Sequence, residues 1–190
     1  MTSTEEFGYE LKIPKERIAV LIGKKGQIKK EIESATNTKI NVDSKDGDVF
    51  ISGGEALSLF TTREIIKAIG RGFNPDIAKL LLKADYVLEI VEIEDFARNK
   101  NDLIRIKGRL IGTEGKARKT VEYITECFIS VYGKTLSIIG DMERAAMARK
   151  AVEGLIAGSP HGNIYKWLEK RRKGIVQKEM LGVEDSQKES

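Results

Sequence analysis

Two short stretches of the chain share a pattern that suits phosphate binding. Residues 21–26 read LIGKKG and residues 110–115 read LIGTEG, so each is an apolar pair followed by Gly-x-x-Gly. Glycines allow the backbone to turn sharply and to approach a ligand closely. A helix that begins at such a loop directs its free N–H groups and the positive end of its dipole toward an anion. Both stretches are therefore candidate phosphate clamps.

Cationic side chains surround both loops, but the loop tips differ. Between residues 21 and 33 the first copy holds four lysines and two glutamates, and two of these lysines form the tip. Between residues 105 and 119 the second copy holds six cations and only Glu114 as a carboxylate. Glu114 repels phosphate at close range, whereas the hydroxyl of Thr113 can donate to it. We therefore expect the second copy to bind more through its flanks than through its tip.

The two loops belong to a longer internal repeat. A shift of 89 positions places the first stretch on the second and matches Ile32 with Val121 and Ile40 with Ile129. Beyond residue 42 the shift becomes 87, because the turn in the first copy is two residues longer. Apolar positions fall on apolar positions across both halves, which indicates a duplicated unit.

The hydrophobic patterns predict the same order of elements in each copy. This order is a strand, a short helix, the loop, a second helix, two strands and a longer helix. The segments in the first copy are 9–14, 15–22, 27–36, 39–42, 49–52 and 55–72, and those in the second copy are 86–93, 99–111, 116–127, 128–140 and 141–158. We expect a first domain over 1–73, a linker helix over 74–84, a second domain over 85–158, and a C-terminal helix with a loose polar tail over 159–190.

These features resemble the KH family of single-stranded nucleic-acid binders. The resemblance rests on IAVLIGKKGQIKKEI in the first copy and GRLIGTEGKARKTV in the second. It implies an α+β protein with two tandem type I KH domains, each a three-stranded antiparallel sheet backed by three helices, plus a C-terminal helix. In this family the loop clamps about four nucleotides while an apolar groove beside it takes the bases. Residues expected to line the grooves include Ile18, Leu21, Ile22, Ile28 and Ile40, with Leu110, Ile111 and Ile129 in the second copy.

The expected RNA-binding set combines the loops, their cationic flanks and part of the grooves. Arg105 and Arg109 are included because they lie at i and i+4 on one helix face. The full set is Ile22, Gly23, Lys24, Lys25, Gly26, Lys29, Lys30, Ile40, Arg105, Arg109, Ile111, Gly112, Thr113, Gly115, Lys116, Arg118 and Lys119. The alternative is that the charges form an ordinary solvated face.

The two copies together with the ending IAGSPHGNIYKWLEKRRK look like archaeal ribosome-assembly KH proteins. These are relatives of the eukaryotic small-subunit processing factor that partners the endonuclease of the rRNA 3′ end. The resemblance implies a non-catalytic, cytoplasmic protein of ribosome biogenesis. It also implies binding of single-stranded RNA near the 3′ end of small-subunit (16S) rRNA, and contacts with initiation factor 2 and an rRNA endonuclease.

The amino-acid composition excludes several other classes of protein. The chain carries 33% charged residues at a net charge of only +4, so anion binding depends on local clusters. The single cysteine, Cys127, and the single histidine, His161, provide no disulfide framework and no His/Cys metal site, and we expect no cofactor. The absence of a long apolar run leads us to expect a soluble intracellular protein without a membrane partner.

Three alternatives remain open from the sequence. A nucleotide-handling enzyme could use Gly-x-x-Gly, although no P-loop or dinucleotide fingerprint is present. The apolar grooves could take peptides, which would make the protein an interaction scaffold, or the protein could be a general RNA or translation-initiation cofactor. In the basic C-terminal segment, Tyr165 and Trp167 either extend an RNA track or pack the helix onto the second copy.

Overall fold

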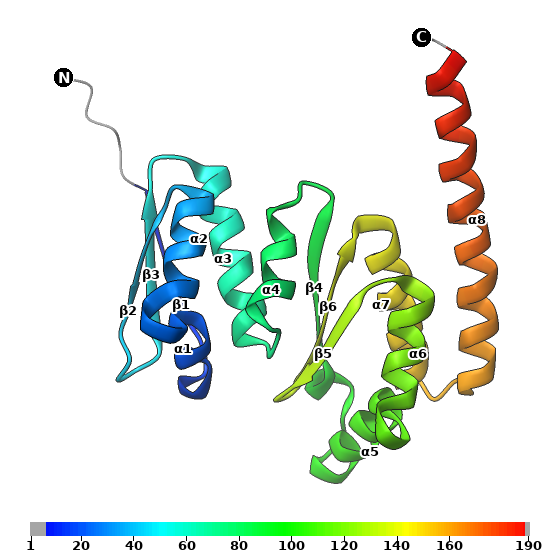
Figure 1. Ribbon diagram of the computed structural model, residues 1–190. Coiled ribbons are helices and arrows are strands. Elements are labelled where there is room, and N and C mark those ends of the chain that lie inside the picture. Colours follow the sequence, from blue (N-terminus) through cyan, green and yellow to red (C-terminus); the bar gives the residue numbers. More distant parts are fainter. Residues whose placement is uncertain (1–6, 189–190) are drawn as a thin grey trace.

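The computed structural model describes the backbone of residues 7–188 and the side chains of residues 7–181. Two α+β units follow one another and a long C-terminal helix completes the chain (Figure 1). The predicted class, two tandem units of three strands and three helices plus a C-terminal helix, is confirmed. Among the described residues, no helix has the length and apolar character needed to cross a bilayer.

The first unit follows the predicted order of elements. It contains β1 (Phe7–Lys12), α1 (Lys15–Ile22), a 3₁₀ turn (Lys24–Gly26), α2 (Gln27–Thr36), β2 (Lys39–Val42), β3 (Asp48–Gly53) and α3 (Ala56–Gly70). Pro14 precedes α1 as its N-cap residue, a position where the fixed φ and missing N–H of proline are tolerated. The linker is only α4 (Pro75–Ala78) and a 3₁₀ turn (Lys79–Leu82), and the side chain of Asn74 caps α4.

The second unit repeats this arrangement. It contains β4 (Tyr86–Glu92), a 3₁₀ turn (Ile93–Phe96), α5 (Lys100–Ile111), a 3₁₀ turn (Thr113–Gly115), α6 (Lys116–Thr125), β5 (Phe128–Tyr132), β6 (Thr135–Asp141) and α7 (Met142–Ile156). The carboxylate of Asp141 accepts from the backbone N–H groups of Glu143 (3.0 Å) and Arg144 (3.3 Å), which is the expected N-cap of α7.

The last helix is longer than the sequence suggested. α8 spans His161–Lys188 and packs on α6 and α7. A loose polar tail was expected over 183–190. This expectation is wrong for residues 183–188, because α8 continues through them. The final two residues of that tail, like residues 1–6 of the expected first domain, lie outside the described part of the chain.

Both sheets are antiparallel and have the same strand order. β3 lies between β1 and β2, and β6 lies between β4 and β5. Ile51 of β3 is opposite Tyr9 on one side and Ile40 on the other, and Ile138 of β6 holds the equivalent place between Glu89 and Ile129. The central strands thus direct Ile51 and Ile138, both nearly inaccessible to solvent, into the helices of their own unit.

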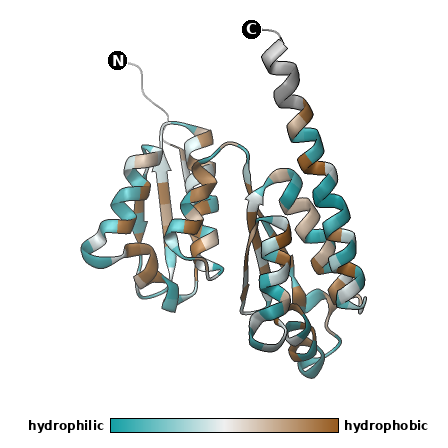
Figure 2. Ribbon diagram, turned by 45° about the vertical axis from the view of Figure 1, so that its right-hand side comes forward, coloured by the Kyte–Doolittle hydropathy of each residue, from teal (hydrophilic) through white to brown (hydrophobic). Residues whose placement is uncertain are grey.

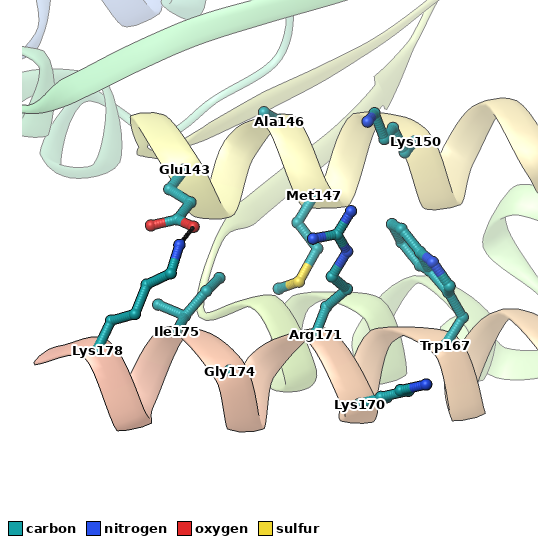
Figure 3. A pocket seen from close by; sticks show the side chains of 10 residues that line it. All are labelled: Glu143, Ala146, Met147, Lys150, Trp167, Lys170, Arg171, Gly174, Ile175 and Lys178. Atoms are coloured by element: carbon teal, nitrogen blue, oxygen red, sulfur yellow. Dashed lines mark ion pairs between the residues drawn. The ribbon is translucent and has the colours of Figure 1, made fainter. Parts of the chain in front are cut away.

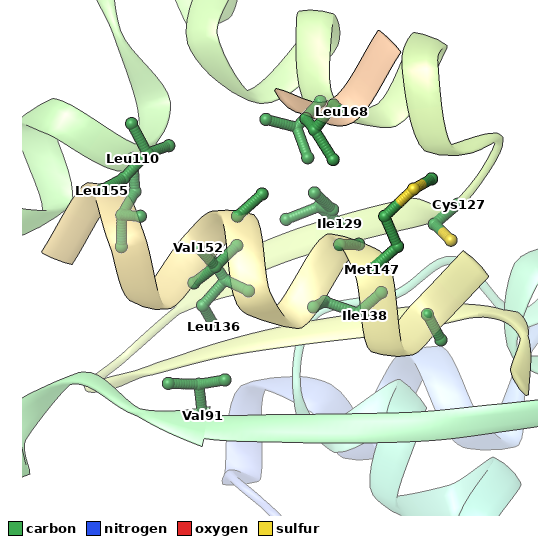
Figure 4. Close-up of a cluster of buried hydrophobic side chains, with 14 of the residues drawn as sticks. Val91, Leu110, Cys127, Ile129, Leu136, Ile138, Met147, Val152, Leu155 and Leu168 are labelled. Carbon is green, nitrogen blue, oxygen red and sulfur yellow. The ribbon is translucent and has the colours of Figure 1, made fainter. Parts of the chain in front are cut away.

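Each unit has its own hydrophobic core between sheet and helices. Figure 4 shows the core of the second unit, where Val152 of α7 lies beside Leu136 of β6 and where Leu168 of α8 joins the same cluster. Hydrophobic residues lie in the strands and on the helix faces turned toward them, whereas the outer helix surfaces are mostly hydrophilic (Figure 2). Burial of these apolar faces is the main stabilising contribution.

The outer face of the second sheet is covered by the first unit and the linker. Ile139, which points away from the core of its own unit, is fully buried in a cluster with Leu81 and Phe73. The hydroxyl of Ser130 donates to the carbonyl of Arg71 at 2.8 Å, and the hydroxyl of Tyr132 donates to the carboxylate of Glu16. The second hydrogen bond lowers the pKa of Glu16 and raises the pKa of Tyr132. The two units are therefore packed directly against each other.

Candidate nucleic-acid interface

The two Gly-x-x-Gly loops have nearly the same backbone conformation. Gly23 has φ 71° and ψ 179°, and Gly112 has φ 72° and ψ 174°. The third residue of each loop is left-handed, with φ 53° at Lys25 and φ 54° at Glu114. Gly26 and Gly115 follow at φ 77° and 75°. Thus the different tip residues are presented from equivalent backbones.

The first glycine of each loop is required for two reasons. Its combination of φ and ψ lies in a region that is essentially restricted to glycine. In addition, a Cβ on Gly23 would lie 2.4 Å from the side chain of Ile28, and a Cβ on Gly112 would lie 2.7 Å from that of Ala117. The loop consequently turns tightly against the start of α2 or α6, and the N-terminus of that helix follows directly.

Lys24 and Lys25 form an exposed cationic tip on the first loop. Together with Gln27 and Lys30 they line a surface depression beside the start of α2. No ion pair is found for either tip lysine within the described residues. Both ammonium groups are therefore available to phosphates.

A second depression continues the first across α2 to β2. The two share Lys30 and Ser34, and the second is also lined by Lys39 and Asn41. The sequence reasoning did not include Lys39 and Asn41, although the alternation of KINV places both on the polar side of the strand. They extend the candidate interface away from the loop.

The second loop has an acidic tip between exposed lysines. Glu114 is exposed at the position that Lys25 occupies in the first loop, and Lys116 and Lys119 of α6 are exposed beside it. The structure thus places opposite charges at equivalent backbone positions. A phosphate that the first tip attracts would be repelled by the second at the same distance.

We expect Glu114→Lys to strengthen binding of single-stranded RNA by about three- to tenfold, because the substitution removes a repulsion and adds a phosphate contact. Titration of a labelled oligonucleotide by fluorescence anisotropy measures the change. Glu10→Lys, at an exposed position on β1, is the matched control for the same change in net charge. Equal gains in the two variants would mean that Glu114 does not face RNA.

Two expected RNA-binding cations also stabilise their own unit. The Lys29 ammonium lies 3.7 Å from the Glu33 carboxylate, and the Arg118 guanidinium lies 3.5 Å from that of Glu122. Each glutamate also accepts from a strand backbone N–H at 2.8 Å, that of Ile40 in the first unit and that of Ile129 in the second. The two units thus share this hydrogen bond as well as their sequence pattern. Lys29 and Arg118 are each partly neutralised by the neighbouring glutamate.

Arg105 is exposed but is also paired. Its guanidinium lies 2.7 Å from the Asp102 carboxylate, one turn earlier in α5. The backbone N–H of Arg98 and the Arg105 side chain together lower the pKa of Asp102. Since surface ion pairs of this kind contribute little, Arg105 can exchange Asp102 for a phosphate.

Arg109 has a different role from the one expected. Its guanidinium donates to the backbone carbonyls of Leu155 (3.1 Å) and Ser159 (2.8 Å), where α7 ends. The guanidinium adds a charged donor at the C-terminal end of α7, where the Leu155 carbonyl also accepts from the backbone N–H of Gly158 at 3.2 Å, and it complements the negative end of the helix dipole. In the first unit Arg17 does the same at the end of α3, bonding to Ile69 and Phe73. We therefore remove Arg109 from the candidate interface.

Ile40 is another correction. Its side chain is fully buried between β2 and the helices, so it supports the groove from beneath and cannot touch a base. Ile22 is only partly buried and Ile111 is 36% exposed, so these two isoleucines offer apolar surface beside the loops. In each unit the structure thus places the loop beside a partly exposed isoleucine, Ile22 or Ile111, and exposed lysines, whereas Ile40 is buried and Arg109 is bonded to the end of α7.

The aromatic residues of the C-terminal segment pack rather than extend an RNA track. Tyr165 and Trp167 are partly buried against the core of the second unit. The Arg172 guanidinium lies 3.1 Å from the Glu126 carboxylate, which also pairs with Arg144. Of the two alternatives for Tyr165 and Trp167, packing onto the second unit is the one observed.

His161 and Cys127 occupy separate, local environments. The imidazole Nε2 of His161 lies 2.9 Å from the carbonyl oxygen of Arg109, at the start of α8. Cys127 is buried, and its Sγ donates to the carbonyl of Thr125 at 3.4 Å. Among the side chains that the structure describes, residues 7–181, no group of three or more His, Cys, Asp or Glu is arranged to hold a metal ion.

Burial raises the pKa of the Cys127 thiol to about 11, so the thiolate is scarce at neutral pH. We expect this thiol to react with an aromatic disulfide reagent at pH 8 only slowly in the folded protein, and rapidly in concentrated urea. Absorbance of the released thiolate measures both rates. Rapid reaction without urea would contradict the buried position.

Comparison with known proteins agrees with this geometry. Residues 8–69 match the KH domain family, and residues 87–173 match the eukaryotic-type (type I) KH domain family. The KH domain-containing protein MJ0443 of Methanocaldococcus jannaschii is 47% identical over 169 residues, which cover 87% of this chain and 74% of that protein. The RNA-binding protein pno1 of Dictyostelium discoideum is 30% identical over 85% of this chain and 70% of its own.

A solved complex provides the structural counterpart. The a/eIF2alpha–aDim2p–rRNA complex from Pyrococcus horikoshii OT3 contains a chain that is 44% identical, with a TM-score of 0.84. The match covers 90% of this chain and 97% of that one. Sheet order, loop conformation and these matches define a tandem type I KH protein. The chain belongs to the two-KH-domain family of archaeal Dim2 and eukaryotic Pno1 proteins.

Proposed function

We propose that this protein binds single-stranded RNA without catalysing a reaction and acts in the assembly of the small ribosomal subunit. The observation that carries the proposal is the repeated loop. The same strained backbone occurs twice, each time at the start of a helix, and the first copy presents Lys24 and Lys25, which form no ion pair among the residues that the structure describes. A structural turn alone would not require two exposed ammonium groups at its tip.

The two units contribute differently to binding. The first clamps the sugar–phosphate backbone with Lys24, Lys25 and the start of α2, and the depressions over Lys30 and Lys39 continue the path. The second contributes Thr113, Lys116 and Lys119 around an acidic tip. Ile22 and Ile111 supply the apolar contacts on which bases rest.

The RNA that we propose is the 3′ end of 16S rRNA. Support comes from the family, since one relative of known structure was solved in a complex with rRNA and relatives carry the names RNA-binding protein pno1 and Pre-rRNA-processing protein PNO1. In this role the protein holds a single-stranded segment until assembly or cleavage is complete. The α subunit of initiation factor 2 and an rRNA endonuclease are the protein partners that we propose.

A direct titration tests the RNA assignment. About 12 nucleotides accommodate two clamps of four nucleotides with a short spacer. We expect a labelled RNA with the 3′-terminal 16S sequence to bind more tightly than a shuffled sequence of the same composition, and more tightly than its DNA counterpart. If four phosphates are neutralised, the logarithm of the binding constant falls with the logarithm of salt concentration with a slope of about −3. Equal affinities for the 3′-terminal and shuffled RNAs would limit the function to general RNA binding.

A second candidate is a translation-initiation cofactor. The presence of a/eIF2alpha in the complex of the Pyrococcus relative favours it. Two binding measurements distinguish this function from the assembly role. The first is the affinity of this protein for purified initiation factor 2 α subunit without RNA, and the second is the same affinity in the presence of the 3′-terminal RNA. Binding that is independent of RNA would support the cofactor role.

A further inference from the structure

A groove between α7 and α8 has no place in the function proposed so far. It has a volume of about 570 Å³ and is lined only by residues of these two helices. Figure 3 shows Met147 of α7 and Ile175 and Trp167 of α8 pointing toward one another within it. No residue of the Gly-x-x-Gly loops, of α6 or of β5 lines this groove, so it is separate from the candidate RNA interface.

The floor of the groove is apolar. Met147 and Ile175 belong to the core of the second unit and are 6% and 8% exposed, whereas Trp167 is only partly buried. Ala146 contributes only a methyl group and Gly174 no side chain, which leaves the space between the helices open. On Gly174, a Cβ would have no neighbour within 4 Å. The groove can therefore take apolar side chains from outside.

The rim of the groove is cationic. Lys150, Lys170 and Arg171 are exposed and form no ion pair with any carboxylate that the structure describes. The only acidic residue of the lining, Glu143, is already paired with Lys178 at 3.6 Å. Three unpaired cations thus surround an apolar floor.

We propose that this groove docks an acidic, amphipathic helix of a partner protein. Apolar side chains at i, i+3 or i+4, and i+7 of that helix would rest on Met147, Ile175 and Trp167, and its carboxylates would pair with Lys150, Lys170 and Arg171. The groove runs along α8 from Trp167 to Lys178, eleven helical steps or about 17 Å. About three helical turns of the partner would lie along this length.

The surface suits a peptide better than RNA. In a KH domain the apolar base contacts lie beside a Gly-x-x-Gly loop that holds the phosphates, and this groove has no such loop. Single-strand sites of other folds stack bases on exposed aromatic faces. Here the Arg171 guanidinium already lies 5.9 Å from the centre of the Trp167 ring, and the rest of the floor is aliphatic. Burial of an apolar face against Met147 and Ile175, with charge pairs at the rim, matches the usual composition of a protein–protein interface.

Trp167 is the only tryptophan of the chain, so its fluorescence reports on this groove alone. The probe is a synthetic peptide of about 15 residues with leucines at helical spacing and glutamates elsewhere. Matched peptides carry glutamine or lysine in place of glutamate, and a 12-nucleotide uridine RNA is titrated separately. We expect the acidic peptide to shift the emission of Trp167 and to bind about tenfold more tightly than the lysine peptide.

Two variants of the full chain test the two halves of the argument. Lys150→Glu/Arg171→Glu should weaken binding of the acidic peptide about tenfold and strengthen binding of the lysine peptide. Gly174→Leu should fill the groove and weaken all three peptides without altering any charge, since the added side chain points into open space. Lys166→Glu, exposed on α8 outside the groove, is the control and should leave peptide binding unchanged.

The proposal is overturned if no peptide changes the emission of Trp167, or if the lysine peptide binds as tightly as the acidic one. It is also overturned if the uridine RNA binds here, with a loss of affinity in Lys150→Glu/Arg171→Glu. This would identify the groove as part of the RNA path. Because the groove and the Gly-x-x-Gly loops share no residue, failure of one assignment does not affect the other.

Discussion

Replacing Lys24 and Lys25 together by aspartate is expected to weaken binding of single-stranded RNA by at least about tenfold, the largest loss that we expect from any pair of substitutions. The change converts two exposed cations at the loop tip into two anions that repel the same phosphates. Lys25 has φ 53°, a left-handed conformation that aspartate tolerates well, so the backbone of the loop should be retained. Anisotropy titration measures the affinity, and circular dichroism confirms that the fold is unchanged.

The matched control reverses the charge of two lysines outside the Gly-x-x-Gly loop. Lys83 in the linker and Lys100 at the start of α5 are exposed, and Lys83→Asp/Lys100→Asp changes the net charge by the same amount. We expect this control to lose only the small, non-specific part of the affinity. Similar losses in the two double variants would show that total charge, and not the GKKG loop, determines binding.

The second large effect concerns two glycines that lie four residues apart. Gly112→Ala is expected to reduce the free energy of unfolding by about 2–4 kcal/mol, because its φ and ψ are nearly restricted to glycine and the new Cβ would meet Ala117 at 2.7 Å. Gly108→Ala should instead increase the free energy of unfolding. It lies inside α5 with no neighbour within 4 Å of the added Cβ, so alanine should stabilise the helix by about 0.5–1 kcal/mol.

Urea denaturation followed by circular dichroism measures both changes, and the second unit should unfold earlier than the first in Gly112→Ala. Each variant serves as the control for the other because both add one methyl group to the same helix region. A stability of Gly112→Ala close to that of the unsubstituted protein would mean that the loop does not hold the conformation described here.

Local patterns were sufficient to predict the repeat and its elements. The spacing of Leu-Ile-Gly-x-x-Gly, the alternation in KINV and the acidic residue at 141 all depend on neighbours in sequence, and the corresponding loop, strand and helix cap are present. The exposed tip residues Lys24, Lys25 and Glu114 follow from the same local geometry. These parts of the candidate site could therefore be located from the sequence.

The errors involve contacts over long sequence distances. Arg109 shares a helix face with Arg105, but its partners are carbonyls 46 and 50 residues away at the end of α7, which no local pattern reveals. Ile40 occupies an alternating strand, but only the packing of α2 over that strand determines that its side chain is fully buried. Charge and hydrophobicity identify a candidate, and tertiary packing then determines which role it has.

The packing between the two units has a counterpart in the sequence. Residues 86–93 read YVLEIVEI, with apolar residues on both faces of the strand that becomes β4. Its neighbour in the sheet, β6, is buried on both faces. A strand of this kind requires cover on each side. The second cover is the linker with the end of α3, and this contact packs the two KH domains directly against each other.

The central claim is that both Gly-x-x-Gly loops face one RNA strand and that the first provides the main clamp. Photocrosslinking of the full chain to a 4-thiouridine-labelled 3′-terminal 16S oligonucleotide, followed by mass spectrometry of the peptides, tests it most directly. We expect crosslinks within residues 21–42 and 110–119, with the larger yield in the first range. Crosslinks confined to α8 or to the outer sheet faces, with both loops free of RNA, would contradict the account.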